Sequence, residues 1–377
     1  DVTFVDADSS EEEIDKALMF YTKDVNPYYY ASLQRIKGTV LTALAQTKNI
    51  DENLAKALDV FEEALSVFNE KDYPKEYAFA RGAQGETYTY IFRVNGDKTM
   101  LEKGVDAYNE TLKYITKENE PVSYAETKTN ISALYIQFLM MSPTEENLKK
   151  TVSSVEDALK IYTLEEFPVN YAMNKNNLAF AYFVGVVDND SRVENLNKAL
   201  DALEEASKVF TIGEYPFRYG AVKINQGRIF TELSDYSDSE INCKKAIAYF
   251  EDALKVYTEE KYPLYYAEAY THLGTAYYTL SLHNDMEENC AKAIEFFYKA
   301  LGIYTFEKYP VYYADVNKSL GKAYCQLSMT RETKNNLDMS IKAYDNSLKA
   351  FNKETFPFLY ADVLQFMGSA YYYRSLI

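Results

Sequence analysis

The sequence has few of the residues from which catalytic and metal sites are usually built. Its 377 residues include no tryptophan, two histidines and three cysteines. Two histidines cannot supply a His-rich metal centre, and three cysteines are a poor basis for a disulfide framework. The sequence also lacks a glycine-rich phosphate loop, and its carboxylates occur as ordinary solvated residues. We therefore predict a protein that is not an enzyme and that binds no cofactor or metal.

Long apolar runs and excess positive charge are missing as well. The longest mostly apolar stretches, residues 131–141 and 178–187, are about half of the roughly 20 residues needed to span a bilayer. The net charge is −17, from 57 acidic against 40 basic residues, and such a chain repels phosphates at long range. Residues 1–10 have no basic and apolar leader pattern. We expect no membrane segment, no nucleic acid and a cytoplasmic protein whose native N-terminus lies further upstream.

The prolines reveal a repeat. Eight of the nine prolines are 47 or 48 residues apart, and only Pro143 lies outside the series. The repeat prolines are Pro27, Pro74, Pro121, Pro168, Pro216, Pro263, Pro310 and Pro357. Positions in each repeat are counted from this proline, so that +3 lies three residues after it.

Each proline is followed by a constant pattern of side chains. Position +3 is always tyrosine, +4 is alanine except at Gly220, +11 is small and +14 is bulky. Offsets of 3, 11 and 14 lie on one face of an α-helix and do not fit a strand. Proline suits the first helical position because its missing N–H has no partner there. This pattern predicts a helix of about 18 residues, helix A, in which the small residue at +11 allows close packing by a neighbouring helix.

A second amphipathic pattern precedes each proline. In one copy it reads Leu54, Ala57, Phe61 and Ala64-Leu65, with apolar residues three or four apart. We predict a helix B here, preceded by a short polar loop whose Asn, Asp, Ser and Thr side chains cap it. Two cysteines, Cys243 and Cys290, take the place of the leucine in their copies and are expected to lie in the core.

These residues resemble the tetratricopeptide repeat, a stacked helix-turn-helix unit. The family pattern of Leu-Gly and an aromatic in helix A, then Ala, aromatic and Ala in helix B, is met by Leu273, Gly274, Tyr277, Ala293, Phe297 and Ala300. The resemblance covers the whole chain and implies an all-α, right-handed α-solenoid of about eight antiparallel helix pairs. It is greatest for the long, 47-residue arrays of bacteria and archaea, since the usual unit is about 34 residues.

In this family helix A lines a concave surface, where asparagines clamp the backbone of a bound extended peptide. The matching position is +9, and the neighbouring inner positions are +8 and +12. The residues there that we predict to bind a partner are Asn130, Asn176, Asn177, Asn225, Arg228, His272, Lys318 and Lys322. An amide can both donate to a peptide carbonyl and accept from a peptide N–H. The alternative is that these amides only link adjacent A helices.

The resemblance therefore implies a scaffold that binds a protein or an extended peptide, with a basic partner favoured by the negative charge. An alternative function is a regulatory or sensor array that controls an attached effector, for example a protease domain. We expect residues 1–377 to form a single solenoid, cut from a longer protein because neither end carries a polar capping helix. Uncapped ends could also support self-association.

Overall fold

The protein is all-α, as predicted. The computed structural model describes residues 5–185 and 191–377, and over these residues it contains sixteen helices and no strands. A B helix comes first and the two types then alternate to the end. The A helices are α2 (Pro27–Leu44), α4 (Pro74–Asn95), α6 (Pro121–Met141), α8 (Pro168–Val184), α10 (Pro216–Leu233), α12 (Pro263–Ser281), α14 (Pro310–Leu327) and α16 (Pro357–Ser375). The B helices are α1 (Val5–Leu18), α3 (Ile50–Leu65), α5 (Lys98–Thr111), α7 (Glu145–Leu159), α9 (Arg192–Ser207), α11 (Ser239–Leu254), α13 (Met286–Leu301) and α15 (Thr333–Leu348).

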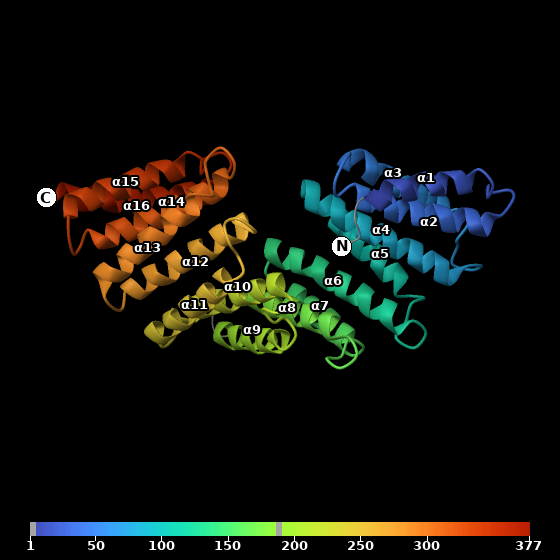
Figure 1. Cartoon of the computed structure of the whole chain (residues 1–377), viewed down its shortest axis with the longest axis horizontal. Coiled ribbons are helices and arrows are strands. Elements are labelled where there is room, and N and C mark those ends of the chain that lie inside the picture. The colour runs from blue at the N-terminus through green and yellow to red at the C-terminus, as the bar shows by residue number, and fades with distance from the viewer. Residues whose placement is uncertain (1–4, 186–190) are drawn as a thin grey trace. The chain divides into compact units, whose positions relative to one another are not determined.

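The helices form two compact units, residues 1–187 and residues 188–377. The N-terminal unit contains α1 to α8, and the C-terminal unit contains α9 to α16. Within each unit an A helix packs against the B helix that follows it, as α2 does on α3 and α12 on α13 (Figure 1). Each B helix also packs on the next A helix. That the two units continue as one solenoid over 1–377 remains a prediction.

The two faces of each stack are packed differently. Successive A helices contact each other directly, as α2 and α4 do in one unit and α12 and α14 in the other. Among the described residues no comparable contact joins successive B helices. The A helices of each unit are therefore more closely spaced than its B helices. Side chains of neighbouring repeats meet on the helix-A side.

The repeat proline begins every A helix. In all eight it occupies the first turn, and the residue before it has a non-helical backbone, such as Tyr262 with φ −140° and ψ 63°. A residue before proline is restricted in this way by the proline ring. The predicted start of helix A is thus confirmed, and the helices run for 17 to 22 residues.

The glycine at +11 makes room for an aromatic ring from helix B of the same repeat. A Cβ added to Gly274 would lie 2.7 Å from the Phe297 ring, and one added to Gly38 would lie 2.5 Å from Phe61. The same pairing, with a spacing of 23 residues, recurs at Gly85, Gly227 and Gly321. The predicted close packing is therefore confirmed. In the copy with Ser132 at +11, the residue 23 positions later is the smaller Val155, and both are buried.

The start of helix B differs from the prediction in four repeats. The N-cap residues Asn49, Asp238, Asp285 and Glu332 have positive φ and make no side-chain cap. Instead, an asparagine four residues later donates from Nδ2 to the carbonyl just before the cap. These donors and carbonyls, at 2.7–3.0 Å, are Asn53 to Lys48, Asn242 to Ser237, Asn289 to Asn284 and Asn336 to Arg331.

Side-chain caps of the predicted kind occur elsewhere, at Asp97 and Thr144. The sequence indicated a polar loop but not which polar side chain closes it. A left-handed cap residue turns its own side chain away from the helix, and the buried asparagine then takes over the polar contact.

The core repeats with the same period. Position −6, just after helix B, holds a buried ring at Phe68, Tyr162, Tyr257, Tyr304 and Phe351. Cys243 and Cys290 are fully buried within the core, as predicted, and the third cysteine is half-buried.

Candidate partner-binding groove

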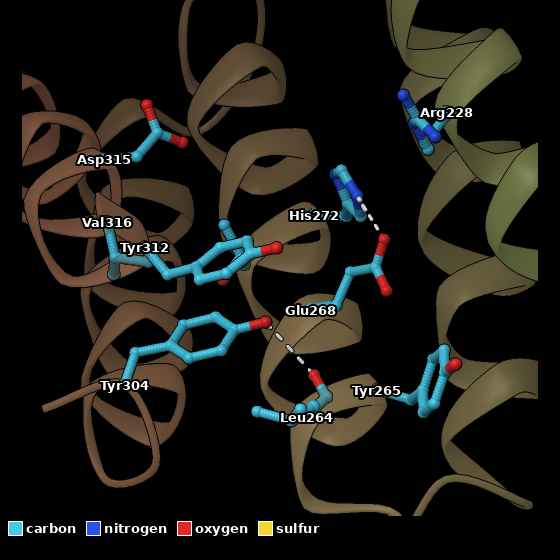
Figure 2. Close-up of a pocket in the computed structure, with 10 residues that line it drawn as sticks. Arg228, Leu264, Tyr265, Glu268, His272, Tyr304, Tyr312, Asp315 and Val316 are labelled. Carbon is cyan, nitrogen blue, oxygen red and sulfur yellow. Dashed lines mark hydrogen bonds and ion pairs between the residues drawn. The ribbon is translucent and has the colours of Figure 1, made fainter. Parts of the chain in front are cut away.

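The C-terminal unit contains a cavity of about 440 Å³ on its helix-A side. Three successive A helices, α10, α12 and α14, contribute most of its walls (Figure 2). The residues that line it are Arg228, Leu264, Tyr265, Glu268, Thr271, His272, Tyr304, Tyr312, Asp315 and Val316. The cavity thus combines charged groups of both signs with two exposed tyrosine rings and an aliphatic floor.

The N-terminal unit contains a smaller cavity, of about 210 Å³, at the same positions of its repeats. It lies on α2, α4 and α6, and α5 adds two further side chains. Its lining residues are Arg35, Thr39, Phe79, Gly82, Ala83, Glu86, Tyr108, Thr111, Ser123, Glu126, Thr127 and Asn130. In both cavities positions +2, +5, +8, +9 and +12 of the A helices line the wall, together with the buried position +6. The first five are called the groove positions below.

A stacked pair of tyrosines forms one wall of the larger cavity. The rings of Tyr304 and Tyr312 lie 4.9 Å apart with an interplanar angle of 18°. The hydroxyl of Tyr304 donates to the carbonyl of Leu264 at 3.1 Å, which ties the ring to α12. Burial raises the pKa of Tyr304, so this hydroxyl stays a donor. The buried Tyr304 thus positions the more exposed Tyr312 at the cavity (Figure 2).

A cluster of charges occupies the middle of the cavity. Nε2 of His272 lies 3.8 Å from Oε1 of Glu268, one helical turn earlier on α12. Burial opposes ionisation of Glu268, but the interaction with His272 and the positive charge of Arg228 outweigh it and lower its pKa. Burial also lowers the pKa of Arg228, against the opposing charges of Glu268 and Glu232. Glu268 is therefore ionised at neutral pH and faces the cavity between two nitrogen-bearing side chains.

In the smaller cavity the surroundings raise the pKa of a glutamate instead of lowering it. Burial raises the pKa of Glu86, and the negative charge of Glu126 raises it further, against the charge of Arg93. Burial lowers the pKa of Arg35, although the charges of Tyr28 and Glu76 oppose this change. The two acids repel each other across successive A helices, whereas Glu268 in the larger cavity lies beside groups that can carry positive charge.

The structure brings two of the predicted site residues together. Arg228 and His272 line the larger cavity, and Asn130 lines the smaller one. Asn176, Asn177 and Asn225 are half-buried on α8 and α10 and line neither of these two cavities.

The two predicted lysines lie on α14 and make contacts within the unit. Nζ of Lys318 lies 2.9 Å from Oδ1 of Asp315 and 5.8 Å from the Phe351 ring centroid. The ammonium of Lys322 lies 4.0 Å from the Phe366 ring centroid, and burial lowers its pKa. Both lysines therefore border the groove, Lys318 beside a ring of the loop after α15 and Lys322 beside a ring of α16.

An amide outside the predicted set links two adjacent A helices. Asn174 at +6 of α8 and Thr129 of α6 lie at hydrogen-bonding distance, with Nδ2 to Oγ1 at 3.0 Å. Asn174 is almost fully buried, and its Nδ2 also donates to the carbonyl of Asn170 at 3.0 Å.

Sequence reasoning missed the aromatic and acidic side chains at +2 and +5. Tyr265 and Tyr312 occupy +2 in two successive repeats, and Glu268 and Asp315 occupy +5. A signal was present, because +2, +5, +9 and +12 follow the 3- and 4-residue spacing of one helix face. The predicted site covered only +8, +9 and +12 and so left this face incomplete.

Among the described residues no helix is long and apolar enough to cross a membrane. Within the same part of the chain, no three or more Cys, His, Asp or Glu residues are grouped so that they could hold a metal ion.

Comparison with known proteins gives the fold. No family model matches this chain, and no curated protein sequence matches it. Among solved structures, the apo form of RapI is 15% identical with a TM-score of 0.51, over 98% of this chain and 96% of that chain. A Rap protein complexed with competence and sporulation factor is 14% identical with a TM-score of 0.46, over 97% and 100%.

The tetratricopeptide domain of P58(IPK) is a more distant neighbour. It is 12% identical with a TM-score of 0.30, over 97% of this chain and 83% of that chain. The likeness to RapI, at 15% identity and a TM-score of 0.51, is one of fold. The chain therefore has a tetratricopeptide-like fold of stacked antiparallel helix pairs, as the repeat pattern predicts.

Proposed function

We propose that this chain is a non-catalytic scaffold that binds an extended segment of a partner protein along the helix-A side of its repeats. The observation that carries this proposal is the shared set of groove positions, which line a cavity in each unit. An array with a period of about 47 residues presents its groove positions to a ligand at regular intervals. An extended peptide has matching regularity, with a donor and an acceptor at each residue.

The side chains at the groove positions suit such a ligand. Asn130 supplies an amide, Thr271 a hydroxyl and His272 an imidazole, and each can bond to a backbone group without reading its side chain. The residues of the larger cavity then add charge and aromatic surface for a side chain of the partner. The net charge of −17 favours a partner with exposed basic residues, chiefly by increasing the rate of encounter.

The predicted amides at +9 provide the first test. A triple variant, Asn130→Ala with Asn177→Ala and Asn225→Ala, should lose at least tenfold in affinity for peptides selected by the wild-type chain from a library of unstructured decapeptides. Fluorescence anisotropy with the selected peptides measures this loss. The helical circular dichroism should stay the same, because these half-buried side chains are not part of the core.

A matched control changes three exposed asparagines on B helices, namely Asn109→Ala, Asn197→Ala and Asn335→Ala. This control should bind every selected peptide with wild-type affinity. If the groove variant melts earlier and still binds every peptide, the amides at +9 are structural and their assignment to the groove is wrong.

A further inference from the structure

Tyr312 presents an open aromatic face in the larger cavity. Tyr304 stacks on one face of its ring, and that tyrosine is buried with only 4% of its surface exposed. Tyr312 itself is 58% exposed. Because a ring has two faces and Tyr304 covers one of them, the exposed surface of Tyr312 includes the other. A ring face carries partial negative charge and attracts cations.

Two carboxylates accompany this ring. Asp315 lies one turn after Tyr312 on α14, so both side chains project from the same face of the helix. Nζ of Lys318 lies 2.9 Å from Oδ1 of Asp315, and a carboxylate has acceptor capacity for further donors. Glu268 faces them from α12, with its pKa lowered (Figure 2). The α14 side of the cavity is therefore acidic and aromatic.

The opposite wall carries positive charge. Arg228 extends from α10 on the far side of Glu268 (Figure 2). It would repel a cation that entered on its side, and it thereby directs a cation towards Tyr312 and Asp315. Asp315 and Glu268 would instead repel a ligand anion from the open ring.

The same unit contains a guanidinium over an aromatic ring at the corresponding repeat position. Arg218 occupies +2 of α10, the position of Tyr312 in α14, and its guanidinium carbon lies 5.2 Å from the centroid of Phe210 at −6. The repeat geometry therefore accommodates a planar cation against an aromatic ring beside the start of helix A. A cation from a partner can use the open ring of Tyr312 in the same way.

We infer that the cavity of the C-terminal unit binds the side chain of an arginine in the partner segment. The guanidinium stacks on the open face of Tyr312 and donates to the carboxylate of Asp315, and its methylene stem lies against Leu264 and Val316. Arginine fits better than lysine because a planar guanidinium stacks on a ring and donates to a carboxylate through two N–H groups. This inference rests on the proposed function, because it names the side chain that the groove recognises.

The test uses the full chain and a set of acetylated, amidated decapeptides with one fixed central residue among randomised neighbours. The central residue is arginine, citrulline, lysine or glycine, and binding is measured by fluorescence anisotropy. Citrulline has nearly the same shape as arginine and no charge. Pools with central arginine should bind at least tenfold more tightly than those with citrulline or glycine, and more tightly than those with lysine.

Two variants locate the site. Asp315→Asn and Tyr312→Leu should each reduce binding of the arginine pool about tenfold or more and leave the citrulline pool unchanged. The matched control is Asp345→Asn, which makes the same change at an exposed position of the B helix α15, away from the groove positions. It should bind all pools as the wild-type chain does, and circular dichroism should be the same for all three variants.

The possible failures are distinct. If all pools bind equally, or if Asp315→Asn does not change the preference for arginine, the inference is wrong and the proposed function stands. Equal binding of the lysine and arginine pools would overturn the stacking on Tyr312. If no pool binds at all, the proposed function and this inference are both wrong.

Discussion

The two cavities occupy the same positions of the repeat but carry different chemistry. In the C-terminal unit, +2 is tyrosine in two repeats, and an ionised Glu268 lies beside His272 and Arg228. In the N-terminal unit, +2 of α6 is Ser123, and Glu86 and Glu126 repel each other. The cavity volumes differ as well, about 440 Å³ against 210 Å³.

The buried positions of the two units are by contrast nearly the same. Both units place a glycine at +11 under an aromatic ring, an alanine at +4 without exposure and a buried asparagine near the start of helix B. The comparison shows that the repeat keeps the contacts that stack the helices and varies the side chains that face a ligand. A binding surface can therefore change from one repeat to another without changing the fold.

The largest effect on stability is expected at the glycines of position +11. It tests whether both units depend on the same packing between helices A and B. Gly274→Leu in the C-terminal unit and Gly38→Leu in the N-terminal unit should each lower the free energy of unfolding by about 3 kcal/mol, through overpacking. The reason is the same in both, because a Cβ at either position would lie within 2.7 Å of an aromatic ring. Urea unfolding followed by circular dichroism measures the loss.

Gly368 provides the matched control for this comparison. It occupies +11 of α16, where a Cβ would meet nothing within 4 Å, so Gly368→Leu should leave the unfolding midpoint unchanged or raise it. Equal destabilisation by Gly368→Leu and Gly274→Leu would show that overpacking against the aromatic ring is not the cause of the loss.

A smaller effect is expected at the start of helix B. Asn336→Ala removes the donor to the carbonyl of Arg331 and should cost about 1 kcal/mol. Asn53→Ala in the N-terminal unit removes the corresponding contact with Lys48 and should cost about the same. The neighbouring Asn335→Ala, at an exposed position, serves as the control and should be nearly neutral.

The smallest effect concerns the carboxyl groups of the two cavities. Carbon-13 NMR titration should show Glu86 losing its proton at a higher pH than Glu268, because their pKa values move in opposite directions. Glu126→Gln should lower the pKa of Glu86, and His272→Ala should raise that of Glu268. Similar pKa values for both groups would remove the electrostatic contrast between the cavities.

The way in which stability depends on pH follows from the directions of these two pKa shifts. The pKa of Glu86 is raised by folding, so its ionised form destabilises the folded state, and that cost disappears as the pH falls below this pKa. The pKa of Glu268 is lowered by folding, so it contributes stability above its unfolded pKa that is lost as the pH falls through the folded pKa. Near pH 7, Glu86→Gln should therefore stabilise the chain slightly and Glu268→Gln should destabilise it slightly.

The fold was predictable because its signals are local and repeated. The repeat proline needs only its own first helical turn, and the spacing of apolar residues needs only one helix. The small residue at +11 also indicated close packing. The ring that fills the space lies 23 residues later, a constant spacing that the sequence contains.

The candidate site was less predictable, because it depends on contacts between repeats. Arg228 and His272 meet in one cavity since successive A helices pack together, with a separation of 44 residues along the chain. The wall formed by Tyr304 and Tyr312 requires the loop after α13, the start of α14 and the carbonyl of Leu264 on α12. No local sequence pattern indicates that one face of the Tyr312 ring is exposed.

The sequence by itself thus determined the helices, their period and the residues that stack them, because these depend on side-chain spacing within one or two helices. Only the tertiary structure decided which groove positions share a cavity, which glutamates have a raised or a lowered pKa and where an aromatic face stays open. Those properties depend on burial and on charges from neighbouring repeats, and both arise only when the helices pack together.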